Sequence, residues 1–310
     1  MLSRLTFRPD QLFALVLCCL LLLIQGSYQP IEGYQTQETP QALSLIDPQP
    51  YPAIAQSNYS PLDDPFTTVS ARSYLIMDPD SATIIKSRNL FLPLHPASSV
   101  KLMTALVAVD TYDLDQVLST DSALNTLGNK VGFLWGARIS VRDLLASILI
   151  NSGNDAAIIL ANNHPEGYEG FINQMNQKAT ELSMHQSSFT NPTGIDDYRQ
   201  LTTNWDLSIL VREVLKNPLL RELVSTKTYQ IKDQLTGHQY NLYNTNQLLH
   251  QLDQIKGVKT GTTFYAQQVL VSLWEEDDHS LLIVIMGSLD RYADTLEIIE
   301  WIKENVVWID

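Results

Sequence analysis

The sequence has very little cysteine. Its only two cysteines, Cys18 and Cys19, lie inside an apolar run from Leu12 to Ile24 near the N-terminus. The chain beyond this run therefore has no disulfide, no thiolate metal site and no cysteine nucleophile. Its six histidines show no H-E-x-x-H or comparable zinc spacing. A metallohydrolase is disfavoured, and we expect no metal ion and no other cofactor.

Basic side chains are also scarce. The chain has 20 Lys and Arg against 34 Asp and Glu, which gives a net charge of -14. Phosphate binding needs a basic surface, so we expect no nucleic-acid partner. An acidic surface is otherwise typical of a soluble protein and identifies no substrate.

The N-terminal segment predicts export. Arg4 and Arg8 precede the run Leu12–Ile24, which has about the length of a signal-peptide core and is short for a membrane span. We interpret residues 1–27 as a signal peptide or an N-terminal anchor, because Gln25-Gly26-Ser27 matches an Ala-x-Ala cleavage site poorly. The rest of the chain is then expected in the periplasm or at the outer face of the cytoplasmic membrane.

The chain after this segment divides at about residue 69. Residues 28–68 are rich in Pro, Gln, Ser and Asp without helical or strand periodicity, which predicts a linker or disordered arm. Residues 69–310 are long enough for one large catalytic domain with its own core.

The pattern of this domain predicts an α+β fold. A strand pair comes first, several helices follow, then three strands and an amphipathic closing helix. The continuous apolar run Ser280–Met286 indicates the buried centre of the sheet. The expected strands are 74–77, 83–85, 255–260, 268–274 and 280–286, and the expected helices are 98–109, 141–151, 155–162, 168–182 and 205–215.

The first segment with chemical potential is Ser98 with Lys101 at a predicted helix start. The i,i+3 spacing places both side chains on one helix face, so a neutral lysine amine can take the serine proton. Burial or a second cation would keep that amine neutral. Taken alone, the pair also fits a surface turn. The apolar neighbours Leu102, Met103 and Leu106 predict instead a buried helix. A lysine is rarely buried there unless it is paired or functional.

Two further segments carry polar groups in the same order along the chain. Ser152-Gly153-Asn154 separates two apolar helical stretches, and either caps a helix or projects into a cleft. Lys259-Thr260-Gly261-Thr262 follows a strand-like run, and a lysine beside a threonine hydroxyl suits a carboxylate. Its alternative interpretation is a strand that ends in a turn.

Together these segments resemble the penicillin-binding serine peptidases, and among them the D-alanyl-D-alanine carboxypeptidase family of low molecular mass. The resemblance extends over about residues 70 to 305. The further matching segments are Tyr74-Leu75-Ile76-Met77-Asp78, Ser140-Val141-Arg142-Asp143-Leu144-Leu145, Ser152-Gly153-Asn154-Asp155-Ala156-Ala157, Met175-Asn176-Gln177-Lys178-Ala179 and Asn191-Pro192-Thr193-Gly194-Ile195-Asp196.

The resemblance implies a β-lactamase/DD-peptidase-like fold, an antiparallel sheet flanked by helices, with a helical lobe that carries Ser152 and Asn154. It implies peptidoglycan stem peptides as substrates and β-lactams as covalent inhibitors. The implied catalytic residues are the nucleophile Ser98, the general base Lys101 and the proton relay Ser152. The implied substrate-binding residues are Asn154, Lys259, Thr260, Gly261, Thr262 and Arg291.

Three other functions are compatible with parts of the sequence. A D,D-endopeptidase that cuts cross-links shares the motifs, and His164-Pro165-Glu166-Gly167-Tyr168 resembles that branch, whereas Ser152-Gly153-Asn154-Asp155 fits the carboxypeptidase branch better. A β-lactamase would need a deacylating glutamate, and Glu169 with Asn173 comes too soon after Asn154. A non-catalytic β-lactam or muropeptide sensor is disfavoured because every catalytic residue type is present.

The resemblance stops at the closing helix. From the resemblance we therefore expect this chain to lack the β-rich C-terminal domain and amphipathic anchor of many family members. Any membrane attachment is therefore expected through the N-terminal segment.

Overall fold

The computed structural model describes residues 55–57, 64–121, 126–277 and 279–308. The chain divides into two units, residues 1–51 and 52–310, and the description that follows concerns the second. The predicted signal peptide or anchor and most of the predicted arm lie outside the described residues. Within them, no helix has the length and apolar character needed to cross a membrane.

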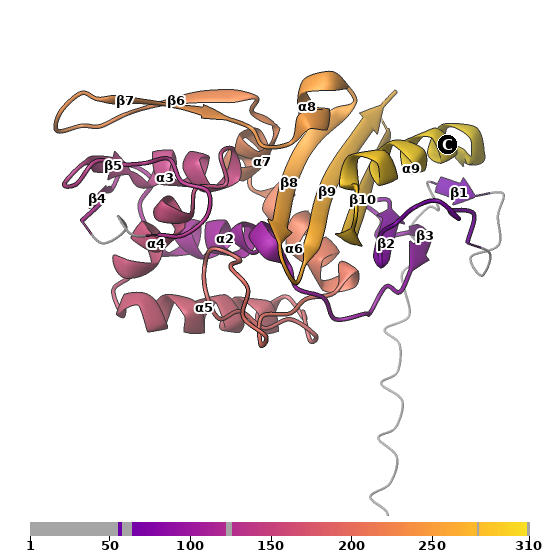
Figure 1. Ribbon diagram of the computed structural model, residues 1–310, viewed down its shortest axis with the longest axis horizontal. Helices are drawn as coiled ribbons and strands as arrows, with labels where there is room; N and C mark the ends of the chain where they lie inside the picture. The colour runs from indigo at the N-terminus through magenta and orange to yellow at the C-terminus, as the bar shows by residue number, and fades with distance from the viewer. Residues whose placement is uncertain (1–54, 58–63, 122–125, 278, 309–310) are drawn as a thin grey trace, which may run out of the picture. The chain divides into compact units, whose positions relative to one another are not determined.

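A five-stranded antiparallel sheet forms the centre of the domain (Figure 1). Its strands follow the order β3-β2-β10-β9-β8. The predicted central strand lies in the middle of the sheet, so that prediction is confirmed, as is the α+β fold. The strands are β2 (Ser73–Met77), β3 (Ile84–Arg88), β8 (Ile255–Thr263), β9 (Gln267–Glu276) and β10 (His279–Ser288).

Alternate side chains of the sheet enter two separate cores. Leu282, Val284 and Met286 of β10 join one apolar cluster, whereas Leu281, Ile283 and Ile285 join the other. This follows from the period of two along a strand, since both faces of the sheet are covered by helices. The first cluster includes α2 (Lys101–Thr111) and α6 (Asn204–Lys216), and the second includes α9 (Arg291–Asn305).

Most of the remaining helices form the predicted helical lobe, whereas α8 (Gln247–Gln251) contributes to the second cluster with α9. Two helices of the domain begin with hydroxyl side-chain caps: the Ser140 hydroxyl accepts from the Asp143 amide, and the Thr203 hydroxyl accepts from the Asp206 amide. The 3-10 turn η1 (Ala97–Val100) leads into α2, and the other helices are α3 (Val141–Leu149), α4 (Asn154–Asn162), α5 (Gly167–Glu181), α7 (Pro218–Ser225) and α8 (Gln247–Gln251).

The domain takes in part of the predicted arm. Strand β1 (Ala55–Ser57) pairs with β11 (Val306–Trp308), and Phe66 is buried in the core under α9. Asp64 accepts a hydrogen bond from the Tyr74 hydroxyl at 2.9 Å. Ordered structure therefore begins before Val69, because single anchoring side chains give no periodicity by which a sequence would reveal them.

Two hairpins were also not predicted. Strand β4 (Val117–Ser119) pairs with β5 (Arg138–Ser140), and β6 (Thr228–Lys232) pairs with β7 (Gln239–Tyr243). One side chain of β6 and two of β7 are buried. So few buried apolar residues give only a weak strand alternation in the sequence.

Candidate active site

The nucleophile candidate lies on a tight turn. Ser98 belongs to η1, directly before the first residue of α2, Lys101. A 3-10 turn has three residues per turn, so its i and i+3 side chains eclipse each other. Accordingly the Lys101 amine lies 3.0 Å from Ser98 Oγ. Ala97, which precedes Ser98, has a positive φ of 48°, a strained backbone conformation for a residue with a side chain.

Lys101 is completely buried. Its Nζ contacts Ser98 Oγ and also donates to the Thr193 carbonyl. Burial lowers the pKa of Lys101 well below its usual range, the charge of Lys259 lowers it further, and Asp155 opposes the shift. Burial and the Lys259 charge thus both stabilise the neutral amine relative to the ammonium, and the neutral amine is the form that can accept a proton.

The second lysine of the site pairs with the second serine. Lys259 on β8 lies 2.9 Å from Ser152 Oγ and donates to the Thr260 carbonyl at 3.0 Å. Ser152 precedes α4 with a positive φ of 59°, a strained conformation for a residue with a side chain. Burial, followed by the charge of Arg291, lowers the pKa of Lys259 to about 7.

Strand β8 lies at the edge of the sheet, so one side of its backbone has no neighbouring strand. Near its C-terminal end this strand packs against the turn that holds the nucleophile. A Cβ on Gly261 would lie 2.9 Å from the Ser98 amide nitrogen and 2.8 Å from Ala97 Cβ. Only glycine therefore allows the strand to approach the turn this closely.

Arg291, the first residue of α9, reaches the same strand. Its Nη1 donates to the Gly261 carbonyl and to Thr262 Oγ1, both at 2.8 Å. Thr260 Oγ1 lies 2.7 Å from Thr245 Oγ1. A guanidinium, an ammonium and two hydroxyls thus converge at this end of the site, which suits a carboxylate.

Asn154 begins α4 on the opposite side. Its Nδ2 donates to the Leu127 carbonyl at 2.6 Å, while its buried Oδ1 has no hydrogen-bond partner in the described structure. A buried amide oxygen without a donor is costly. A ligand N–H at this position would satisfy it.

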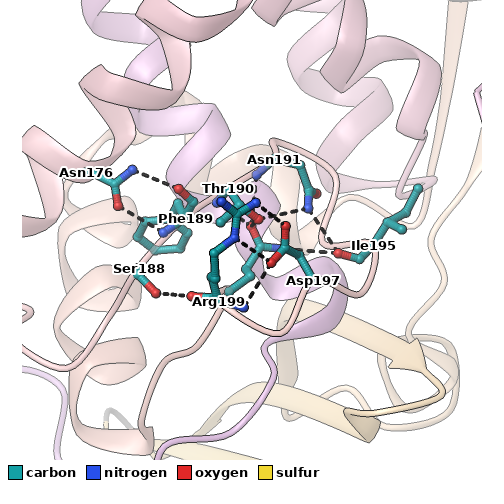
Figure 2. A network of polar contacts seen from close by, with 9 residues as sticks. Asn176, Ser188, Phe189, Thr190, Asn191, Ile195, Asp197 and Arg199 are labelled. Carbon is teal, nitrogen blue, oxygen red and sulfur yellow. Dashed lines mark hydrogen bonds and ion pairs between the residues drawn. The ribbon is translucent and has the colours of Figure 1, made fainter.

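A loop after α5 forms the floor beneath the nucleophile. Asn191 Oδ1 accepts from the amides of Thr193 and Gly194. Its Nδ2 donates to the Ile195 carbonyl at 3.0 Å (Figure 2). Asn176 of α5 bonds both polar backbone groups of Phe189, which ties the loop to that helix. The loop is therefore held from within and from α5.

The structure brings all nine candidate residues together around one cleft of about 290 Å³. Seven of them line the cleft, and the two lysines lie buried beneath, hydrogen-bonded to Ser98 and Ser152. The seven are Ser98, Ser152, Asn154, Thr260, Gly261, Thr262 and Arg291. Glu169, considered above as a deacylating residue, is exposed on α5 and does not line the cleft.

Three residues that contribute to the site had no predicted role. Thr193 and Gly194 belong to a segment that carried the resemblance, yet nothing in the sequence indicated that their backbone would contact Lys101 and Ala97. Thr245 lies in a loop before α8 without any motif. Contacts made by backbone atoms or by an isolated hydroxyl leave no pattern in a sequence.

Comparison with known proteins places the chain in a family. The sequence model described as D-alanyl-D-alanine carboxypeptidase matches residues 58–289. The chain belongs to the D-alanyl-D-alanine carboxypeptidase family. The predicted family is thereby confirmed.

Individual relatives of this family differ in activity. D-alanyl-D-alanine carboxypeptidase DacF of Bacillus subtilis is 29% identical over 224 residues, which span 70% of this chain but 57% of that longer relative. D-alanyl-D-alanine endopeptidase of Escherichia coli is 30% identical over 248 residues, 77% of this chain and 79% of the relative. The family and DacF agree with the predicted carboxypeptidase function, and the endopeptidase agrees with the alternative.

Solved structures of the family share the fold. The Streptomyces K15 DD-transpeptidase matches with a TM-score of 0.71 and 26% identity, over 76% of this chain and 97% of that one. A D-alanyl-D-alanine carboxypeptidase of Mycobacterium tuberculosis matches with a TM-score of 0.72 and 26% identity, over 79% and 94%. The predicted DD-peptidase-like fold is confirmed.

Proposed function

We propose that this protein is an exported serine-type D-alanyl-D-alanine carboxypeptidase that removes the terminal D-alanine from peptidoglycan stem peptides. The contact between Lys101 and Ser98 carries the proposal. A fully buried amine with a strongly lowered pKa lies 3.0 Å from a serine hydroxyl at the edge of a cleft. This is the arrangement that nucleophilic acyl transfer needs.

In the acylation step, Lys101 Nζ takes the proton of Ser98 Oγ as this oxygen attacks the carbonyl between the two D-alanines. The backbone N–H groups of Ser98 and Thr262 hold the oxyanion. The C–N bond then breaks, and Ser152 relays to the departing amine the proton that Lys101 took from Ser98. Water hydrolyses the resulting ester of Ser98 and releases the shortened peptide.

Substrate binding uses the two ends of the cleft. Lys259, Thr260 and Arg291 bind the terminal carboxylate, and Asn154 accepts a hydrogen bond from the substrate amide through its unpartnered Oδ1. The charge of Lys259 also disfavours protonation of Lys101. β-Lactams acylate the same Ser98 hydroxyl.

The N-terminal segment supports the location that this substrate requires. Its apolar run fits export, and peptidoglycan lies outside the cytoplasmic membrane. If the segment is not cleaved, it attaches the enzyme to the outer face of that membrane.

A D,D-endopeptidase is the second candidate. Two relatives named D-alanyl-D-alanine endopeptidase, from Pseudomonas aeruginosa and Escherichia coli, are 30% identical to this chain and match over 79% of their length. The same acylation chemistry would then act on a D-alanine carbonyl within a cross-link.

Digestion of purified muropeptides separates the two activities. We expect pentapeptide monomers to lose one alanine, with a Ser98→Ala variant as the inactive control. Conversion of cross-linked dimers to monomers, with pentapeptides left intact, would replace the carboxypeptidase proposal by the endopeptidase.

A further inference from the structure

A groove of about 390 Å³ adjoins the catalytic cleft and has no role in the chemistry described above. The two share Thr193 and Ile195 in their walls. The groove is lined by Thr126, Leu127, Ile158, Tyr168, Asn191, Thr193 and Ile195. Within the described part of the chain, its lining therefore has no charged side chain.

The groove joins the cleft on the acyl side. The carboxylate-binding residues Thr260 and Arg291 line the cleft but not the groove. Leu127 of the groove directly precedes Gly128 and Asn129, which line the cleft beside Asn154. A peptide with its carboxylate at Arg291 thus directs the residue before its two D-alanines toward the groove.

Two residues of the groove wall, Ile195 and Ile158, are held in place before any ligand binds. Ile195 stands in the loop that Asn191 bonds from within, and that loop is tied to α5 through Asn176 (Figure 2). Ile158 packs against the main apolar core. A preformed apolar wall favours an apolar ligand group, because no ordering is needed when it binds.

The nearest acidic residues along the chain do not provide a charge partner. Neither Glu169, which follows Tyr168 on α5, nor Asp196, which follows Ile195, lines the groove. One Asp196 oxygen accepts from the Tyr265 amide at 3.1 Å, and the other, Oδ1, is buried without a partner among the described residues. A charged side chain that entered the groove would lose part of its hydration without gaining an ion pair from the lining residues.

We infer that this groove is a specificity subsite that selects stem peptides whose side chain before the two D-alanines is uncharged, with its amine acylated or its carboxyl amidated. The inference rests on the proposed function. Net charge alone would give the opposite preference, because a chain of charge -14 attracts a peptide with a free ammonium group.

The test compares two tripeptides, Nα-acetyl-L-Lys-D-Ala-D-Ala with the lysine side-chain amine either acetylated or free. We expect the wild-type enzyme to show a kcat/KM about tenfold higher for the acetylated peptide, a difference of about 1.4 kcal/mol. Leu127 is 73% exposed, so charges are tolerated there. Leu127→Asp should lower the ratio about two- to fivefold, and Leu127→Lys should raise it.

Matched variants control for the overall charge of the protein. Leu235, 68% exposed beyond β6, lines neither the groove nor the cleft. Leu235→Asp and Leu235→Lys should leave the ratio unchanged. Equal kcat/KM values for the two peptides, or a ratio that the Leu127 pair does not move in opposite directions, would overturn the inference. Absence of cleavage of either peptide would count instead against the proposed function.

Discussion

Lys101→Met is expected to lower kcat/KM for a D-Ala-D-Ala peptide by about 10²–10⁴-fold, the range that a positioned general base contributes. Methionine is unbranched and fills the buried space of the lysine stem, but it cannot accept the Ser98 proton. The Thr193 carbonyl loses its donor at a cost of about 1–3 kcal/mol. Removal of an amine from a buried site offsets part of that cost, so the variant should stay folded.

The pH dependence of kcat/KM tests whether Lys101 is the general base. In the wild-type enzyme kcat/KM should rise with pH as Lys101 loses its proton, because only the neutral amine is a base. It should fall again from about pH 7 as Lys259 becomes neutral and binds carboxylate less well. Bound carboxylate holds Lys259 protonated, so this alkaline limb should move to higher pH in kcat. Lys101→Met should lack the acid limb.

Lys86→Met is the matched control. Lys86 is equally buried, 2% exposed, but stands on β3 at the edge of the sheet opposite β8. Its replacement should change kcat/KM less than about twofold in the folded protein. Lys101→Met with wild-type kcat/KM and an unaltered acid limb would show that another group is the base.

Gly194→Ala is expected to damage both stability and the nucleophile turn. The residue has a φ of 85°, and a Cβ there would lie 1.9 Å from the Ala97 carbonyl oxygen and 2.8 Å from the Ser98 amide nitrogen. These are backbone atoms, so no side chain can move aside. Either the loop or the turn must shift. A shift of the turn displaces Ser98 from Lys101, and a shift of the loop displaces the Thr193 carbonyl from the Lys101 amine.

Gly167→Ala separates the clash from the cost of a positive φ. Gly167 has a φ of 70°, and a Cβ there would meet nothing within 4 Å. This control should lose about 1–2 kcal/mol of unfolding free energy. Gly194→Ala should lose at least about 2 kcal/mol more in denaturant unfolding, and its folded fraction should react with penicillin at least about tenfold more slowly. Equal effects of the two substitutions would contradict the proposed contact between loop and nucleophile.

The fold was largely predictable because its apolar pattern is strong. The run Ser280–Met286 has no polar interruption after its first residue, and the structure places it at the centre of the sheet. Phe66 and β1 were missed because their contacts are long-range and few. Pairing of β1 with β11 joins segments about 250 residues apart, which no local pattern reveals.

The candidate site likewise contains residues that the sequence predicted and contacts that it did not. Ser98 with Lys101, and Lys259 with Thr260, are side chains at short, fixed spacings, so the sequence predicted which residues to consider. The cross-pairing of Lys259 with Ser152 depends on how α4 meets the sheet edge. The Thr193 carbonyl depends on the path of a loop. Such contacts follow from tertiary packing, which the sequence specifies only as a whole.

Intact mass of the full chain after incubation with a penicillin tests most directly whether Ser98 is the nucleophile. We predict a stable increase by one penicillin, located by peptide mapping to the peptide that holds Ser98, and no increase in a folded Ser98→Ala variant. An adduct that persists in Ser98→Ala, a wild-type chain without any adduct, or rapid turnover of the penicillin without an acyl-enzyme would contradict the account.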